Sequence, residues 1–146
     1  MRYEIEKTLD HVLYLARRFK KEDVEQVIMM LLIELGIPTH YDGFDYLVKA
    51  VSIFCNDPTQ MIVKGLYPAV ARQYDRDMES THIEQAIRGA IQFAWNKHDD
   101  DIWMLYFPPG KEGMKKPTNT EFVSRLAYAV ELWKACREKY AEEVMK

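Results

Sequence analysis

The chain has 146 residues, of which 48% are hydrophobic, and a formal net charge of −3 at pH 7. This length and apolar content suit a single domain with one core, whereas the longest apolar run, residues 27–33, is far too short to span a bilayer. The charged N-terminus lacks the apolar segment of a secretory signal, so we expect a cytoplasmic protein without a membrane partner. A negative net charge is unusual for a dedicated nucleic-acid binder, but one face of the protein can still be basic.

Apolar residues recur at helical spacing from the N-terminus onward. The spacing predicts one helix over residues 5–19 and a second over residues 24–35. Gly36 ends the second helix, and Pro38 prevents its resumption. The inward stripe of the first helix is predicted to include Leu9, Val12, Leu13 and Ala16. We expect residues 1–30 to form a helical extension that either packs on the core or pairs with another copy of the chain.

Shorter helical segments follow in the middle of the chain. A third helix is predicted to open at Asp42 and to stop before Pro58. A short helix is predicted over residues 59–66. Pro68 then begins another, because a proline fits the first turn of a helix, where its missing N–H is not needed.

Two capping boxes mark the later helices. Thr81 with Glu84 predicts the start of a regular amphipathic helix, and Thr118 with Glu121 predicts the start of the last helix. No segment alternates as a strand does, and no internal repeat is present. The predicted fold is therefore all-α: a compact helical domain over residues 31–146 that contains a helix-turn-helix.

The helices that begin at Pro68 and Thr81 are the pair with functional interest. A short helix, a polar turn and a longer helix form the arrangement that places the second helix in the major groove of DNA. Arg pairs well with guanine edges and Gln with adenine edges, so the outward face of the second helix suits base contacts. Its outward positions are His82, Gln85, Arg88, Gly89, Gln92 and Asn96. The alternative is an ordinary solvated face of a helical bundle.

Five stretches of the chain resemble a known family. They are ELGIPTH (34–40), GFDYL (43–47), LYPAVA (66–71), IRGAIQFAW (87–95) and KPTNTEF (116–122). In this order and at these separations they resemble the C-terminal effector domain of the sporulation response regulator known as stage-zero sporulation protein A. The resemblance covers residues 31–133. It implies a six-helix effector fold whose helix-turn-helix recognises a short DNA box, commonly as tandem copies.

The resemblance also indicates which positions contact bases. The family carries Arg where this chain has His82, Glu at Glu84, Arg where it has Gln85, Arg at Arg88 and His where it has Gly89. Two contact positions are thus retained and three differ. Together with the outward face, the predicted base-facing residues are His82, Glu84, Gln85, Arg88, Gly89 and Gln92. Family members place a phosphorylatable receiver domain before the effector, and residues 1–30 are too few for one, so we expect no gating by an aspartyl phosphate within this chain.

Phosphate contacts are expected beside the recognition helix. The loop after residue 110 carries three lysines, and hydroxyl groups lie at the start of two helices, where phosphate oxygens bind well. The predicted phosphate-contacting residues are Ser80, Thr81, Lys115, Lys116 and Thr120. A loop that is simply solvated is the alternative.

The remaining polar clusters do not indicate a metal site, a cofactor or catalysis. Residues 99–101 lack the alternating ligands and glycine of a calcium loop. A turn and a helix cap explain His40, Asp42 and Asp45 more simply than a metal cluster does. Phosphate-loop, serine-hydrolase and zinc-protease motifs are absent from the sequence. We therefore expect no catalytic residue, no metal and no cofactor.

Two functional hypotheses remain from the sequence. The leading one is a sequence-specific transcription regulator that binds double-stranded DNA with the helix near Thr81. The alternative is a protein-interaction module: a stand-alone effector paralogue that associates with itself or that binds or occludes another transcription regulator. The acidic balance, the altered contact positions and the N-terminal helix favour this alternative.

Overall fold

The computed structural model describes residues 2–19, 22–59, 62–74 and 78–145. Its elements in chain order are α1 (Arg2–Arg18), α2 (Val24–Glu34), α3 (Asp42–Asn56), a π-helical segment η1 (Ile62–Leu66), α4 (Tyr67–Ala71), α5 (Ser80–Asn96), α6 (Asp100–Tyr106) and α7 (Asn119–Met145). In these ranges the structure contains no β-strand, only an isolated bridge between Gly110 and Gly113. The all-α prediction is confirmed.

Local hydrogen bonds fix both ends of α2. The side chain of Asp23 accepts a hydrogen bond from the backbone N–H of Gln26 at 2.8 Å, and the Gln26 side chain accepts from the backbone N–H of Asp23 at 3.0 Å. At the other end, the N–H of Ile37 donates to the carbonyl of Leu32 at 3.0 Å. This closing turn requires φ of +87° at Gly36, a conformation that glycine adopts without strain. The predicted helix end at Gly36 is confirmed.

Helices α3 and α5 approach each other closely because of a glycine. A Cβ at Gly43 would lie 2.3 Å from the carbonyl oxygen of Ala86 and 2.8 Å from the Cβ of Ala90. Only hydrogen fits there, so this position sets the separation of the two helices. Around this contact the core continues into α2 and α7. Its fully buried members include Leu32, Leu47, Val51, Ile87, Phe122, Leu126 and Trp133.

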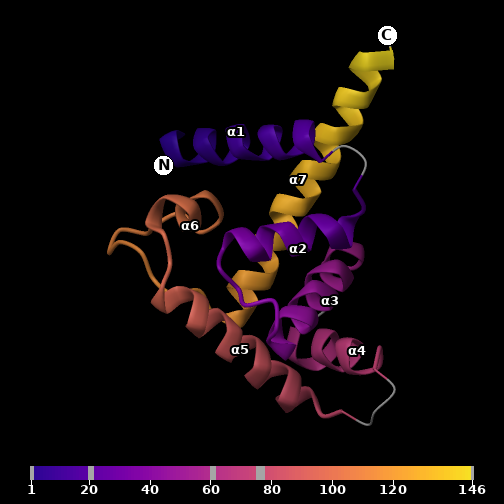
Figure 1. Cartoon of the computed structure of the whole chain (residues 1–146), viewed down its shortest axis with the longest axis vertical. Coiled ribbons are helices and arrows are strands. Elements are labelled where there is room, and N and C mark those ends of the chain that lie inside the picture. Colours follow the sequence, from indigo (N-terminus) through magenta and orange to yellow (C-terminus); the bar gives the residue numbers. More distant parts are fainter. Residues whose placement is uncertain (1, 20–21, 60–61, 75–77, 146) are drawn as a thin grey trace.

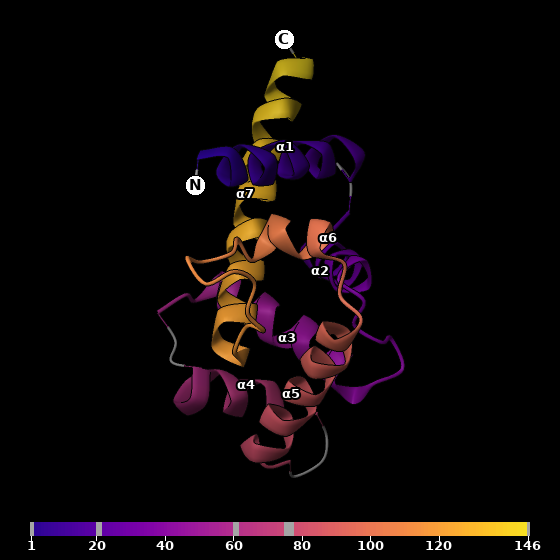
Figure 2. The ribbon, with the colours of Figure 1, turned by 90° about the vertical axis from the view of Figure 1, so that its left-hand side faces the viewer.

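The long helix α7 runs through the molecule, with α1 packed across it at one end and α5 at the other (Figures 1 and 2). Helix α1 packs against α7 and α6. Val12 and Ala16 are buried there as predicted, but Leu9 and Leu13 are 41% and 42% exposed. The prediction of a single inward stripe was therefore wrong for these two leucines, because they lie on the flank of α1 away from its packing partners.

The predicted helix starts have mixed outcomes. Thr118 caps α7, since its hydroxyl accepts from the N–H of Glu121 at 3.1 Å. The predicted cap at Thr81 is wrong: the N-cap of α5 is Glu79, two residues earlier, and no side chain accepts a capping hydrogen bond there. Thr81 instead contacts the Glu79 carboxylate at 3.4 Å. Of the short helix predicted over residues 59–66, residues 60–61 lie outside the described part and the rest includes η1, which continues directly into α4, so it is not separate from the helix predicted to begin at Pro68.

None of the described helices combines the length and the apolar content needed to cross a bilayer.

Candidate nucleic-acid interface

Helices α4 and α5 form the pair of interest, joined by residues 72–79, of which 75–77 lie outside the described part. Val70 and Ala71 of α4 are buried, as are Ile83 and Ile87 of α5. These apolar contacts hold the short helix against the first turns of the long one. The opposite face of α5 is left outside the core.

That outer face of α5 is polar and uncovered. Thr81, His82, Gln85, Arg88 and Gly89 are exposed, while Ser80, Glu84 and Gln92 are half-buried. Helix α1 packs at the other end of the molecule, against α6 and α7, and does not cover this face (Figure 1). The predicted base-facing residues thus lie on one accessible surface.

The two contact positions retained from the resemblance form an ion pair. The Arg88 guanidinium donates to the Glu84 carboxylate at 2.6 Å, one helical turn apart. The Arg88 side chain is 60% exposed, so the guanidinium keeps donors that point away from the protein. Glu84 therefore orients Arg88 along α5 without burying it.

Gln92 is engaged at both ends of its amide. Its oxygen accepts from the Lys116 ammonium, and its nitrogen donates to the Asn96 side chain at 2.8 Å. Each end of the amide keeps one further hydrogen-bonding site, but these two contacts hold the side chain in place. In this structure Gln92 attaches the basic loop to α5, which is a role that the sequence did not indicate.

Aromatic residues support the first turn of α5. The ring centroids of His82 and Tyr46 lie 5.9 Å apart, and those of Tyr46 and Tyr74 lie 5.3 Å apart. Both pairs are in the edge-to-face arrangement. Burial, with the nearby charge of Asp45, raises the pKa of the Tyr74 hydroxyl to about 12. The hydroxyl therefore stays protonated and adds no negative charge beside this end of α5.

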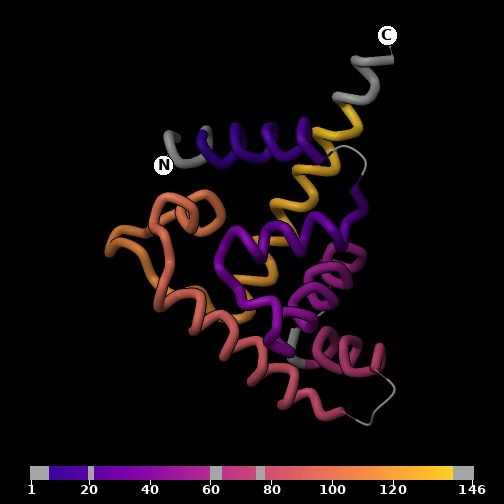
Figure 3. The backbone as a smooth tube through the Cα atoms, in the orientation of Figure 1, coloured from indigo at the N-terminus to yellow at the C-terminus, as the bar shows by residue number. Residues whose placement is uncertain are grey.

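The loop between α6 and α7 lies alongside α5 and carries Lys111, Lys115 and Lys116, all exposed. Figure 3 follows its path from α6 back to the start of α7.

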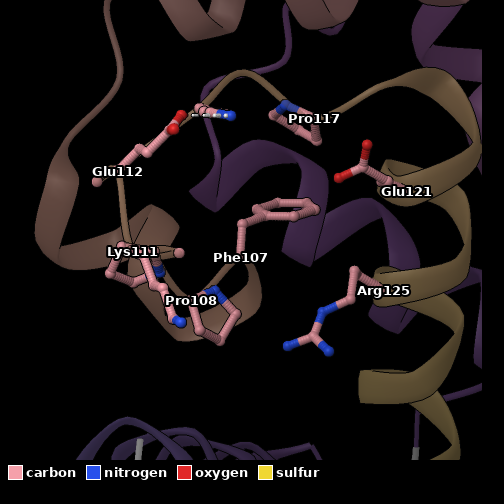
Figure 4. A pocket seen from close by; sticks show the side chains of 11 residues that line it. Phe107, Pro108, Lys111, Glu112, Pro117, Glu121 and Arg125 are labelled. Carbon is pink, nitrogen blue, oxygen red and sulfur yellow. Dashed lines mark ion pairs between the residues drawn. The ribbon is translucent and has the colours of Figure 1, made fainter.

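The loop and the first turns of α7 line an open hollow of about 1060 Å³. Figure 4 shows Lys111 and Arg125 on its rim, and the ion pair between Lys115 and Glu112, 3.1 Å long, is drawn as a dashed line. Thr120 is exposed on the first turn of α7.

The sequence prediction missed a residue that joins three helices. Asn119, the first residue of α7, donates through its side-chain nitrogen to the hydroxyl of Tyr67 on α4 and to the backbone carbonyl of Glu84 on α5, each at 3.1 Å. Its place directly after the capping residue Thr118, inside the KPTNTEF stretch, was the available indication. Hydroxyl and amide side chains before a helix were interpreted there only as capping groups.

The family comparison agrees with this arrangement. The protein-family model described as "Sporulation initiation factor Spo0A C terminal" matches residues 28–130. The chain belongs to this family. The match runs from α2 into α7 and includes the α4–α5 pair and the basic loop, whereas α1 lies outside it.

Membership in the Spo0A C-terminal family gives the general activity. This family is a DNA-binding, non-catalytic effector domain of transcription regulators. The resemblance stated from the five sequence stretches is confirmed. In the described ranges, no group of three or more His, Cys, Asp or Glu side chains is placed to bind a metal ion.

Proposed function

We propose that this member of the Spo0A C-terminal family is a sequence-specific transcription regulator that recognises the DNA major groove through α5. The observation that carries the proposal is the exposed polar face of α5, on which Arg88 is oriented by Glu84 at 2.6 Å. An α-helix fits the major groove, and an Arg guanidinium recognises the two acceptors of guanine. A carboxylate that fixes the guanidinium reduces the entropy lost when Arg88 meets a base.

Phosphate contacts accompany this role in the proposal. Lys116 is attached to Gln92 on α5, so the basic loop is fixed beside the recognition helix. The lysines of this loop neutralise phosphates on the flank of the groove. Ser80 and Thr81 lie at the N-terminus of α5 and Thr120 lies at that of α7, where backbone N–H groups favour anions. Helix α5 itself carries one acid and one base, Glu84 and Arg88, so it does not repel the DNA backbone.

The test is an unbiased DNA selection followed by affinity measurements on the enriched sequence. Arg88→Ala is expected to weaken specific binding by about 1–3 kcal/mol, because one guanine contact is lost. Arg18→Ala is the matched control: Arg18 contacts Tyr14 on α1, at the opposite end of the molecule, and its removal changes the net charge equally. Enrichment of no motif, or equal losses for the two variants, would contradict the proposal.

A second candidate function is association with another protein chain. Three residues of α2 favour it, because Met29, Met30 and Ile33 are 38%, 38% and 57% exposed on one face of the helix. Exposed apolar clusters of this kind are common at protein interfaces. Sedimentation over a range of concentrations, with Ile33→Glu as the disrupting variant, distinguishes self-association from a monomer. A monomer at all concentrations would exclude a self-associating role.

A further inference from the structure

Asn119 links the two helices of the helix-turn-helix to the first turn of α7. Its side-chain nitrogen has two hydrogens, and the two acceptors, the Tyr67 hydroxyl and the Glu84 carbonyl, each lie 3.1 Å from it. A backbone carbonyl can only accept, so the amide nitrogen must face Glu84. Both hydrogens of this amide group are therefore used, and neither bond is to water.

The acceptor on α5 is the backbone carbonyl of Glu84, the residue whose side chain binds Arg88. In an α-helix the carbonyl of Glu84 also accepts from the N–H of Arg88, and its remaining lone pair receives the hydrogen bond from Asn119. The side chain of the same Glu84 holds the Arg88 guanidinium. A continuous series of hydrogen bonds thus runs from Tyr67 through Asn119 and Glu84 to Arg88.

The surroundings make this series rigid. Tyr67 is only 2% exposed, and burial raises the pKa of its hydroxyl, so the group remains a neutral hydrogen-bonding partner at physiological pH. Asn119 is half-buried at the start of a 27-residue helix whose N-terminus is capped by Thr118. The amide is therefore presented from a fixed support and not from a loose loop.

We propose that Asn119 is a positioning residue for DNA recognition: through the Glu84 carbonyl and the Tyr67 hydroxyl it fixes the rotation of α5 relative to α4, and hence the direction of Arg88. This inference rests on the proposed function, because it concerns how the same recognition helix is held. It differs from a capping role, which Thr118 already fills. It also differs from base contact, since both hydrogens of the Asn119 amide are directed at α4 and α5.

Affinity measurements on the selected DNA test the inference. Asn119→Ala is expected to weaken specific binding about tenfold and to leave non-specific binding and the salt dependence unchanged, because no phosphate contact is removed. Tyr67→Phe, which leaves the bond to Glu84, is expected to have a smaller effect. Ser124→Ala is the control, because within the described ranges the Ser124 hydroxyl donates only to carbonyls of α7 itself. A loss that the fraction of unfolded protein explains fully would overturn the inference.

A double-mutant cycle separates positioning from general weakening. If Asn119 acts through Arg88, then Asn119→Ala costs little once Arg88 is already Ala, so the two effects are not additive. Additive effects would overturn the inference while leaving the proposed function intact.

If the unchanged protein selects no DNA motif, the proposed function fails instead. Amide hydrogen exchange over residues 84–88 then decides the inference: Asn119→Ala must accelerate it more than Ser124→Ala does, and equal rates would overturn it.

Discussion

The Nε2 atom of His11 on α1 lies 3.0 Å from the Glu34 carboxylate on α2, and the Tyr106 hydroxyl of α6 donates to the same carboxylate at 2.8 Å. The three side chains join α1, which lies outside the family match, to two helices of the matched domain. Burial alone would raise the pKa of Glu34. The hydrogen bonds from His11 and Tyr106, with the charge of His11, outweigh it and lower the pKa below its ordinary value.

This cluster predicts a pH-dependent contribution of Glu34 to stability. A carboxyl whose pKa is lower in the folded protein stabilises it above the unfolded pKa, near 4.5, and loses that contribution as the pH falls through the folded pKa. Glu34→Gln should therefore reduce the free energy of unfolding by about 1–2 kcal/mol at neutral pH and by much less in strong acid. Denaturant titrations at several pH values measure this. Glu25→Gln, which removes a half-buried ion pair with Lys49, is the control, and an equal loss there would contradict the prediction.

Gly43, where α3 contacts α5, and Gly89, on the exposed face of α5, should respond oppositely to alanine. A Cβ at Gly43 would collide with the backbone of Ala86, so Gly43→Ala should destabilise the protein by about 1–3 kcal/mol. At Gly89 no atom lies within 4 Å of an added Cβ, so Gly89→Ala should stabilise it by up to about 1 kcal/mol through helix propensity. Thermal denaturation of both variants checks the signs. A stabilised Gly43→Ala protein would show that α3 and α5 are farther apart than described.

The sequence alone predicted those helix ends that depend on hydrogen bonds between residues close together in the chain. Gly36 with Pro38 predicted the end of α2, and Thr118 with Glu121 predicted the start of α7, because each is a local hydrogen-bond arrangement. The cap at Thr81 failed for a physical reason: α5 begins at Ser80, which shifts Thr81 into the first turn. Helix boundaries one or two residues apart have nearly equal local energies, so the packing of the helix decides between them.

Contacts between distant segments were not predictable from periodicity. Leu9 and Leu13 fit an inward stripe, yet α7 covers only part of that stripe. Similarly, nothing in the spacing of α5 indicated that Gln92 would bind Lys116, which is 24 residues away. The outward face of α5 was predicted correctly as a surface, but which of its side chains are engaged depends on where the loop after α6 returns.

The Cys55 thiol should be unreactive in the folded protein. Burial, together with the charge of Glu131, raises its pKa to about 11, and the Sγ atom lies 3.8 Å from the carbonyl of Ala127. In a Cys136→Ser background, alkylation near pH 8 should be about 100-fold slower in the folded chain than in urea, because the reactive thiolate is that much rarer. Mass spectrometry against time measures both rates. Equal rates in the two states would contradict the burial of this thiol.

The raised pKa of the Cys55 thiol affects stability only at high pH, where the thiol of the unfolded chain ionises and that of the folded chain does not. The unfolded thiol ionises near 9 and the folded one near 11, so the folded state loses stability as the pH rises between these values. Cys55→Ala should therefore show a weaker decrease in melting temperature over this interval than the Cys136→Ser protein does. An identical decrease would mean that other groups account for it.

The ion pair between Glu112 and Lys115 leads to a prediction about the basic loop. Lys116→Ala should weaken binding to all DNA sequences and reduce the slope of log affinity against log salt by about one, because one phosphate contact is lost. Glu112→Gln should do the opposite, since it frees Lys115 and removes a carboxylate from the DNA side of the loop. Both side chains of the Glu112–Lys115 pair are more than 70% exposed, so Glu112→Gln should not alter stability measurably. Anisotropy titrations at several salt concentrations distinguish the two variants, and an unchanged salt slope in both would mean that this loop does not lie against the DNA backbone.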